Sequence, residues 1–154
     1  EPVVTHDILP TLADLAGSVE QVGQDIEGVS LVPLLRQTDS KVDRAFDSLV
    51  FHYPHYNLVG MSEPHSAIRF GDYKLVDFPV SDRQLLFNIS KDIGESEDLS
   101  SEKADLVSLM KNKMETYLSK VGAERPEEAY NWETTGKKGD VRTKFFRRYS
   151  ADFE

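Results

Sequence analysis

The sequence predicts an α+β fold in which a four-stranded antiparallel sheet is packed by a long helix toward the C-terminal end, with a leading helix before the sheet. Two observations predict this class. Four short segments rich in β-branched and aromatic residues lie between residues 48 and 89, and their short connections favour antiparallel pairing. A long helical pattern follows over residues 101–121, and a sheet covered on one face by such a helix forms a two-layer unit.

The leading helix is predicted over residues 5–16. Its apolar side chains recur at the spacing of one helix face: Ile8, Leu9, Leu12, Leu15 and Ala16. Asp7 or Thr5 is the predicted N-cap, Pro10 falls in the first turn and Gly17 is a suitable stop. The chain begins with neither an initiator methionine nor a signal peptide, so we interpret it as a piece of a longer or processed protein.

The four strands are predicted over residues 48–53, 65–70, 72–78 and 84–89. Between the second and third strands lie Gly71 and Asp72, and a tight Gly-containing turn between two extended runs is typical of a β-hairpin. The order Gly-Asp leaves the turn type open.

The long helix is predicted to start at an N-cap formed by Ser100 or Ser101 and to end at Gly122. Its apolar stripe comprises Leu106, Met110, Met114, Tyr117 and Val121, widened by Val107 and Leu118. We interpret Met110 and Met114 as core residues rather than as part of a cofactor site, because methionine fills irregular gaps in a core.

The composition excludes several classes of function. A net charge of -9 argues against a nucleic-acid surface, which needs clustered Lys and Arg, although a locally basic pocket could still bind an anion. The chain has no cysteine, so it can form neither a disulfide nor a thiolate metal site, and it has no cysteine nucleophile. It also lacks the long apolar run of about 18 residues that a membrane-spanning helix needs.

Five motifs, taken in their order, resemble the C-terminal part of type I sulfatases, which are formylglycine-dependent enzymes of the alkaline-phosphatase-like superfamily. These motifs are THDILPTLADLAG, GVSLVPLL, FHYPHY, SAIRFGDYKLV and LLFNISKDIGESEDLS. The resemblance covers about residues 1–121. It implies that a large N-terminal α/β domain, absent from this chain, holds calcium and a formylglycine made within a C/S-x-P-x-R motif. This sequence has no such motif, so we expect neither a catalytic residue nor a cofactor within it.

The resemblance also implies a division of the chain. Residues 1–45 would be the end of the large sulfatase domain and a connection, and its helix would be the last helix of that domain. Residues 46–122 would be the C-terminal subdomain, which helps to shape the substrate pocket. Residues 123–154 would be a tail that wraps along the domain and docks by its rings. The resemblance finally implies export of the parent enzyme to the periplasm, the medium or the lysosome.

His52 and His55 are the predicted substrate-binding residues, with acid/base assistance as a further possible role, because they lie where a strand leads into a loop, next to the pocket that the resemblance implies. The alternative is that neighbouring rings pack and both histidines hydrogen-bond locally. A zinc site formed with His65 is less favoured, since residues three apart in a strand point to opposite faces.

Other polar groups are interpreted as structural. Arg69 and Lys74 could bind a sulfated or carboxylated sugar, but a cross-strand pair with Asp72 or Asp77, or a solvated turn, is favoured. The acidic group does not have EF-hand spacing and is interpreted as a turn: Asp92, Glu95, Glu97 and Asp98.

Two further features lie outside the main interpretation. The sequon at Asn88 is taken as a chance match. Trp132 and the FFRRY run at 145–149 could form a partner surface or bind an anion or a sugar, and the alternative is a tail anchored on its own domain or on the missing one.

The predicted function is therefore that of a C-terminal sulfatase fragment, inactive alone, from an enzyme that hydrolyses a sulfate ester on a sugar or polysaccharide. Its partners would be the missing catalytic domain and a sulfated small molecule or glycan, with no nucleic acid and no membrane, and the isolated fragment could self-associate. The alternatives are an independent carbohydrate- or protein-binding module, or a fragment of a related phosphatase or phosphonate hydrolase. An uncovered apolar face on the leading helix would distinguish a fragment from a self-contained module.

Overall fold

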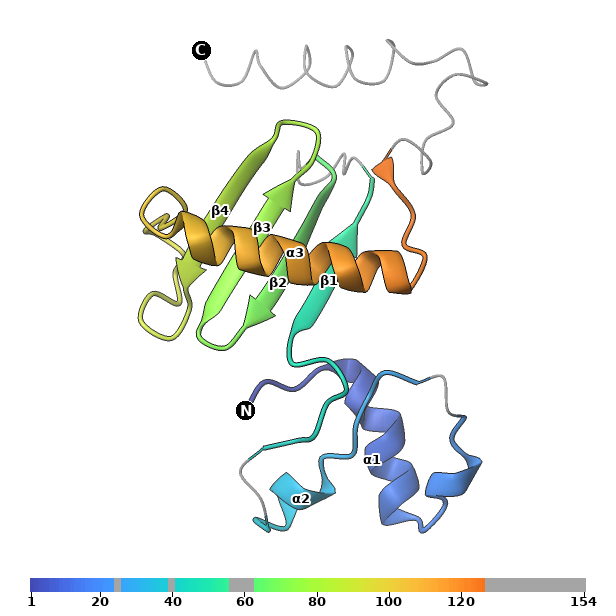
Figure 1. Cartoon of the computed structure of the whole chain (residues 1–154). Helices are drawn as coiled ribbons and strands as arrows, with labels where there is room; N and C mark the ends of the chain where they lie inside the picture. The colour runs from blue at the N-terminus through green and yellow to red at the C-terminus, as the bar shows by residue number, and fades with distance from the viewer. Residues whose placement is uncertain (24–25, 39–40, 56–62, 127–154) are drawn as a thin grey trace, which may run out of the picture. The chain divides into compact units, whose positions relative to one another are not determined.

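The computed structural model describes residues 1–23, 26–38, 41–55 and 63–126 (Figure 1). The chain divides into two compact units, residues 1–47 and residues 48–154, and each is described by itself. The docking predicted for the tail falls on residues outside the described ranges from 127 onward, so it stays a prediction.

The first unit is built from short helical elements: η1 (Thr5–Asp7), α1 (Ile8–Leu15), η2 (Val19–Gln21) and α2 (Val32–Leu35). The predicted leading helix is therefore a 3₁₀ turn that runs directly into an α-helix. The helix ends as expected at Gly17, whose φ of 67° lies in the left-handed region that glycine adopts without strain. The short apolar segment after the loop forms the single turn of α2.

Asp7 ties three segments of this unit together. Its buried carboxylate accepts hydrogen bonds from the backbone N–H of Val4 at 2.9 Å and of Val29 at 3.0 Å. The guanidinium of Arg44 donates to both carboxylate oxygens, at 2.8 and 2.6 Å. Asp7 does occupy the N-cap position of α1, but its side chain makes no capping hydrogen bond. The prediction of Asp7 as the N-cap is confirmed by position, but its carboxylate binds Val4, Val29 and Arg44 instead of capping α1.

A close backbone approach accompanies this cluster. A Cβ atom on Gly28 would lie 1.9 Å from the carbonyl oxygen of His6, far inside van der Waals contact. Glycine at this position therefore allows the segment that carries Val29 to reach Asp7.

The second unit contains a four-stranded sheet of order β1-β2-β3-β4 with every neighbouring pair antiparallel (Figure 1). The strands are β1 (Leu49–Tyr53), β2 (His65–Phe70), β3 (Tyr73–Phe78) and β4 (Arg83–Asn88). Each lies within one residue of its predicted range, and the hairpin turn at Gly71 is confirmed, with a φ of 56°.

The long helix α3 (Ala104–Lys120) packs across one face of the sheet against β2 and β3 (Figure 1). The core between them consists of buried apolar side chains: Ile68, Leu75, Leu86, Met110, Met114 and Leu118. The core role of the two methionines is confirmed. Val121, predicted on the same stripe, is exposed instead because it follows the last helical turn. The α+β fold with a leading helix and a C-terminal helix is thus confirmed.

The two ends of α3 differ in how well they were predicted. The helix begins after Lys103, so the predicted serine cap was wrong. The hydroxyl of Ser100 donates instead to the carboxylate of Asp98. The end at Gly122 is confirmed by its φ of 61° and by a hydrogen bond from Ala123 N to Leu118 O at 2.9 Å.

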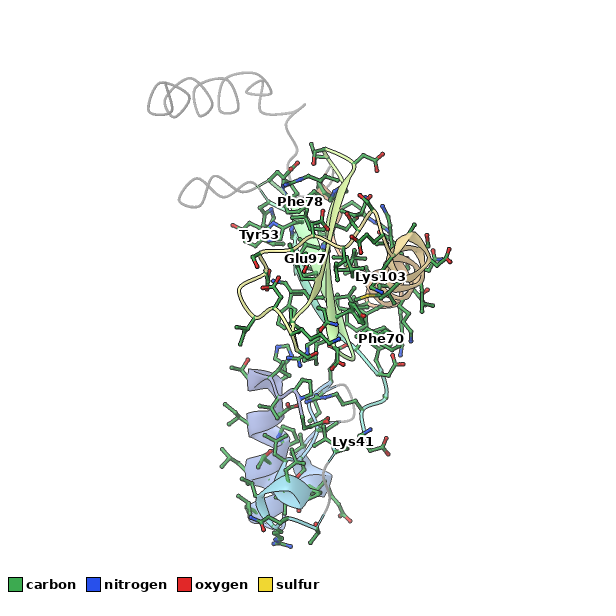
Figure 2. All side chains as sticks on the ribbon, turned by 90° about the vertical axis from the view of Figure 1, so that its left-hand side faces the viewer. Lys41, Tyr53, Phe70, Phe78, Glu97 and Lys103 are labelled. Atoms are coloured by element: carbon green, nitrogen blue, oxygen red, sulfur yellow. The ribbon has the colours of Figure 1, made fainter. Side chains whose placement is uncertain are left out.

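The sheet has two different faces, because successive side chains in a strand point to opposite sides. The inner face carries Ile68 and faces α3. The outer face lies on the other side, where the segment 89–103 crosses part of the sheet. Figure 2 views the sheet edge-on and shows Tyr53 and Phe78 on the outer side and Lys103 toward α3. Of the helices that the structure describes, none is long and apolar enough to cross a lipid bilayer.

Candidate functional site

A row of rings crosses the outer face at one end of the sheet, and we call Tyr53, His65, Phe78 and Arg83 the ring row. The antiparallel register places Tyr53 directly opposite His65, and Phe78 directly opposite Arg83. The ring centroids of Tyr53 and His65 are 5.8 Å apart and those of His65 and Phe78 are 5.7 Å apart, both pairs tilted by 37°. The guanidinium carbon of Arg83 lies 4.1 Å from the Phe78 centroid, a cation–π contact.

Local hydrogen bonds hold the ring row in place. The Nδ1 atom of His65 lies 2.8 Å from the carbonyl oxygen of Glu63, and the carboxylate of Glu63 accepts from the hydroxyl of Ser81 at 2.9 Å. A long ion pair of 3.9 Å links Glu63 to Arg83. Tyr53 remains 39% exposed, so the row offers an accessible aromatic surface with a cation at one end and an acid beside it. Such a surface can stack against a sugar ring and hydrogen-bond its hydroxyls.

The structure separates the two predicted substrate-binding histidines. His55 makes an edge-on contact with Tyr53, with centroids 5.8 Å apart and planes at 87°, and so extends the ring row beyond β1. His52 points to the inner face, where its Nδ1 lies 2.8 Å from Ser66 Oγ and its Nε2 lies 2.7 Å from the carbonyl oxygen of Glu124. Because both ring nitrogens of His52 have partners, its contacts are those of a positioning residue.

Ser66 and His52 share a hydrogen bond like that between a catalytic nucleophile and its base, but they lack the accessible position that such a pair needs. Ser66 is buried beneath α3, where a substrate has no direct access. The neighbouring Asp77, also buried, accepts from Lys111 at 2.9 Å and from Gln84 at 2.8 Å. This inner polar group therefore supports the sheet and helix rather than forming a hydrolytic centre.

The histidines do not come together as metal ligands. His52 lies on the inner face, whereas His65 and His55 belong to the ring row. Over the described residues, the structure has no group of three or more histidine, aspartate or glutamate side chains arranged to hold a metal ion.

Arg69 and Lys74 lie directly opposite each other on the outer face. Lys74 pairs with Glu95, at 2.6 and 2.8 Å to its two oxygens, so the predicted pairing with Asp72 or Asp77 was wrong. The reason is that segment 89–103 folds over this face and brings Glu95 to Lys74. The Nε atom of Arg69 is buried and has no hydrogen-bond partner in the described part of the chain.

The acidic segment at 92–98 is a tightly bonded turn. The Asp92 carboxylate accepts from the backbone N–H of Ser96 at 2.7 Å and of Glu97 at 2.9 Å, and chiefly the latter bond holds the pKa of Asp92 below its usual value. Burial alone would raise the pKa of Asp98, but hydrogen bonds from Leu86 and Ser100 outweigh it and lower that pKa. The carboxylates of Asp92 and Asp98 are thus engaged by protein donors, as expected of a structural turn.

The remaining predicted features add no further contact to the site. Asn88 ends β4, and its side-chain oxygen accepts from the hydroxyl of Ser90 at 2.8 Å. Trp132 and the run at 145–149 lie outside the described residues.

Sequence reasoning missed the ring row, although part of its signal was present. The two-residue turn places Phe70 opposite Tyr73, and counting outward from this pair brings His65 opposite Phe78.

Comparison with known proteins gives a consistent result. The model of a protein family described as N-sulphoglucosamine sulphohydrolase, C-terminal, matches residues 1–121. A solved 2-O GAG (glycosaminoglycan) sulfatase is 26% identical with a TM-score of 0.59, and the match covers 74% of this chain and 24% of that one. A protein of Bacteroides thetaiotaomicron VPI-5482 gives the same four values.

A third solved structure, a complex with its substrate D-glucosamine-2-N,6-O-disulfate, is 25% identical with a TM-score of 0.62, and the match covers 80% of this chain and 25% of that one. Among curated proteins, none matches. The chain thus spans about a quarter of the length of the solved proteins to which it is similar.

Proposed function

Because the chain belongs to the N-sulphoglucosamine sulphohydrolase C-terminal family, we propose that it is the C-terminal part of a sulfatase that hydrolyses a sulfate ester on a sugar. The family match over residues 1–121 carries this proposal. The similarity to a solved protein in complex with its substrate D-glucosamine-2-N,6-O-disulfate supports a sulfated amino sugar, within a small molecule or a glycan, as the substrate class.

The residues present do not fit the family's nucleophile or its metal. The chain has neither a cysteine nor an S-x-P-x-R sequence from which formylglycine could be made. Within the described ranges it has no group of three or more acidic or histidine side chains that could hold a metal ion. We therefore assign both groups to another part of the protein and derive no chemical step through them.

The exposed face of α1 supports a partner domain. Four apolar side chains on this short helix are each more than half exposed: Ile8 at 55%, Leu9 at 58%, Leu12 at 59% and Leu15 at 55%. A helix of a self-contained module would bury such a stripe. The proposed cover is the N-terminal catalytic domain of the sulfatase.

Within this function, the ring row and His55 would form the wall that meets the sugar. The rings present flat apolar faces, Arg83 and Glu63 supply charged groups of both signs, and His55 adds a hydrogen-bonding edge. His52 would hold the end of β1 in place, since its two hydrogen bonds connect β1 to β2 and to the segment after α3.

The function is tested by sulfate release. We expect a protein that contains this chain together with the catalytic domain to release sulfate from sulfated amino sugars, and we expect the purified 154-residue chain to release none. A panel of phosphate esters and phosphonates serves as the comparison. Release of phosphate but not of sulfate would overturn the proposal in favour of a phosphatase or phosphonate hydrolase.

The two histidines are tested by separate substitutions in the active protein. His55→Ala is expected to lower kcat/KM about tenfold or more with an unchanged Tm, because it removes a group that meets the sugar. His52→Ala is expected to lower Tm, because Ser66 and the Glu124 carbonyl lose their partner. Unchanged kinetics in His55→Ala would remove this residue from the site.

A second candidate is a carbohydrate-binding module without catalysis, and the exposed ring row is the observation that favours it. This candidate predicts that the 154-residue chain binds sulfated sugars at full strength by itself. The sulfatase proposal predicts weaker binding by the chain than by the protein that also contains the catalytic domain.

A further inference from the structure

The geometry points to Arg69 as the binding site for a second anionic group of the ligand, a sulfate or carboxylate carried by a sugar beyond the one that meets the ring row. This inference rests on the proposed function, because it takes a sugar on the outer face as given. It makes the ligand an oligosaccharide with an anionic group away from the sugar on the ring row.

The first support is a side-chain donor of Arg69 that lacks a partner among the described residues. Its side chain is partly buried, and its Nε atom is buried without a hydrogen-bond partner in the described ranges of the chain. A buried donor without a partner is costly, and an anion that pairs with the guanidinium offsets this cost. Its planar fork of donors fits the oxygens of a sulfate or a carboxylate, often with two parallel hydrogen bonds.

The second support is the charge of its surroundings. Lys74 lies opposite Arg69, but the carboxylate of Glu95 already contacts its ammonium group with both oxygens. On the other side, β1 places the apolar Leu49 opposite Arg69. Among the described residues, the ammonium of Lys74 is thus paired, whereas the guanidinium of Arg69 keeps a donor without a partner, which favours an anion at this part of the outer face.

The third support is the spacing along β2. Arg69 and His65 lie on the same face four residues apart, which corresponds to roughly 13 Å in a strand. Between them the register places Ala67 opposite Phe51 and Val76. Phe51 is 56% exposed, so an open apolar side chain lies between the two sites on the β1 side, over which a chain of sugars can reach from the ring row to Arg69.

The direct test is an NMR titration of the 154-residue chain that follows the Nε–H signal of Arg69. We expect this signal to shift in a saturable manner with inorganic sulfate and with acetate, but not with chloride at the same ionic strength. The Nε–H of Arg83, which lies over the Phe78 ring, serves as the internal control and should move less. A sulfate response without an acetate response would specify a sulfated ligand, and the reverse a carboxylated one. An Arg69 signal that responds to neither anion would overturn the inference.

Binding measurements then connect this site to the sugar. Arg69→Gln is expected to weaken the binding of a sulfated heparin tetrasaccharide at least tenfold and to leave its desulfated counterpart unaffected. Tyr53→Ala should weaken both, and Arg69→Lys, which keeps the charge without the fork, should lie between wild type and Arg69→Gln. Equal loss for both sugars in Arg69→Gln would contradict the inference.

The outcomes separate this inference from the proposed function. If the complete protein releases sulfate but Arg69→Gln weakens the binding of both tetrasaccharides equally, the anion site is refuted and the proposed function stands. If Arg69→Gln weakens only the binding of the sulfated tetrasaccharide but the complete protein releases no sulfate, the anion site stands and the proposed function is refuted. If Arg69→Gln fails to fold, Arg69→Lys and the wild-type titration still decide the question.

Discussion

The carboxylate of Asp7 is the residue whose ionisation matters most clearly for the first unit. Burial on its own would raise the pKa of Asp7, but the hydrogen bonds from Arg44, Val4 and Val29 outweigh it and lower the pKa from 3.8 to about 2. Because the folded state holds this proton less tightly than the unfolded state, the cluster stabilises the fold fully above about pH 4. That contribution is lost as the pH falls toward 2.

The first prediction follows from this difference in pKa. Acidification from pH 4 to pH 2 is expected to destabilise residues 1–47 by about 2 kcal/mol through Asp7, measured by the NMR signals of their backbone amides. Asp7→Asn should already be destabilised at pH 7 and should show a flatter dependence over this range. The exposed Asp43→Asn is the matched control and should follow wild type. An Asp7→Asn variant with the wild-type pH profile would contradict the prediction.

At this scale the sequence supported some assignments and misled others. Alternation along β1 holds for His52, which points inward while its neighbour Tyr53 faces outward, because alternation depends on local geometry alone. The pairing of Asp7 with Val29 and Arg44, and that of Lys74 with Glu95, could not be predicted, because these partners lie more than twenty positions away. Short-range spacing suggested a helix cap and a cross-strand pair, and long-range contacts overrode both.

At the scale of elements, the hydrophobic pattern placed all four strands and the core of α3. The register between β2 and β3 follows from a two-residue turn, so the contact of His65 with Phe78 was accessible by counting. The register of β1 was not accessible, because a long connection joins β1 to β2 and its length does not determine which residues face each other. The contact of Tyr53 with His65 could therefore be found only from the structure.

The second prediction concerns the packing of α3. Met110→Ala is expected to destabilise the second unit by about 2–5 kcal/mol, because it removes a fully buried side chain and leaves a cavity. Leu109→Ala, on the same helix but 48% exposed, should change stability by only about 0.5 kcal/mol. Chemical denaturation of the two variants measures the difference, and comparable losses would show that α3 does not pack as described.

The third prediction concerns the approach of two segments in the first unit. Gly28→Ala is expected to cost about 2 kcal/mol or more, since the added Cβ would collide with the backbone of His6 and displace Val29 from Asp7. Gly23→Ala is the matched control, because a Cβ there would meet no atom within 4 Å. Thermal unfolding followed by the amide signals of residues 1–47 gives the comparison, in which equal effects would be unexpected.

At the scale of the whole molecule, the apolar face of α1 is the feature that a single chain leaves unexplained. The helix pattern was predicted from the sequence, but whether another element of the chain covers it was not, because burial depends on tertiary contacts. The structure leaves these side chains exposed. Together with the span of about a quarter of its solved relatives, this supports the proposed dependence on a catalytic domain.

The fourth prediction is that the isolated 154-residue chain self-associates through this face. Leu12→Glu is expected to weaken the association roughly tenfold or more, because it removes a contact worth about 1.5–3 kcal/mol and adds a charge. Leu109→Glu, an exposed change on the other unit, should have no effect. Sedimentation over a range of concentrations measures both, and a wild-type chain that stays monomeric at high concentration would refute the prediction.

The alternation of faces in β2 also limits how the chain length of this unit can vary during evolution or engineering. Adding or deleting one residue within β2 would turn Ile68 out of the core and Arg69 into it, and the same slip would remove His65 from the ring row. The hydrophobic core and the proposed sugar-binding surface therefore depend on the same strand register, and neither can be changed in β2 without the other. Insertions are compatible with the sheet only in its connections, and a graft at residues 79–82 would have to keep Ser81, whose hydroxyl donates to Glu63 beside the ring row.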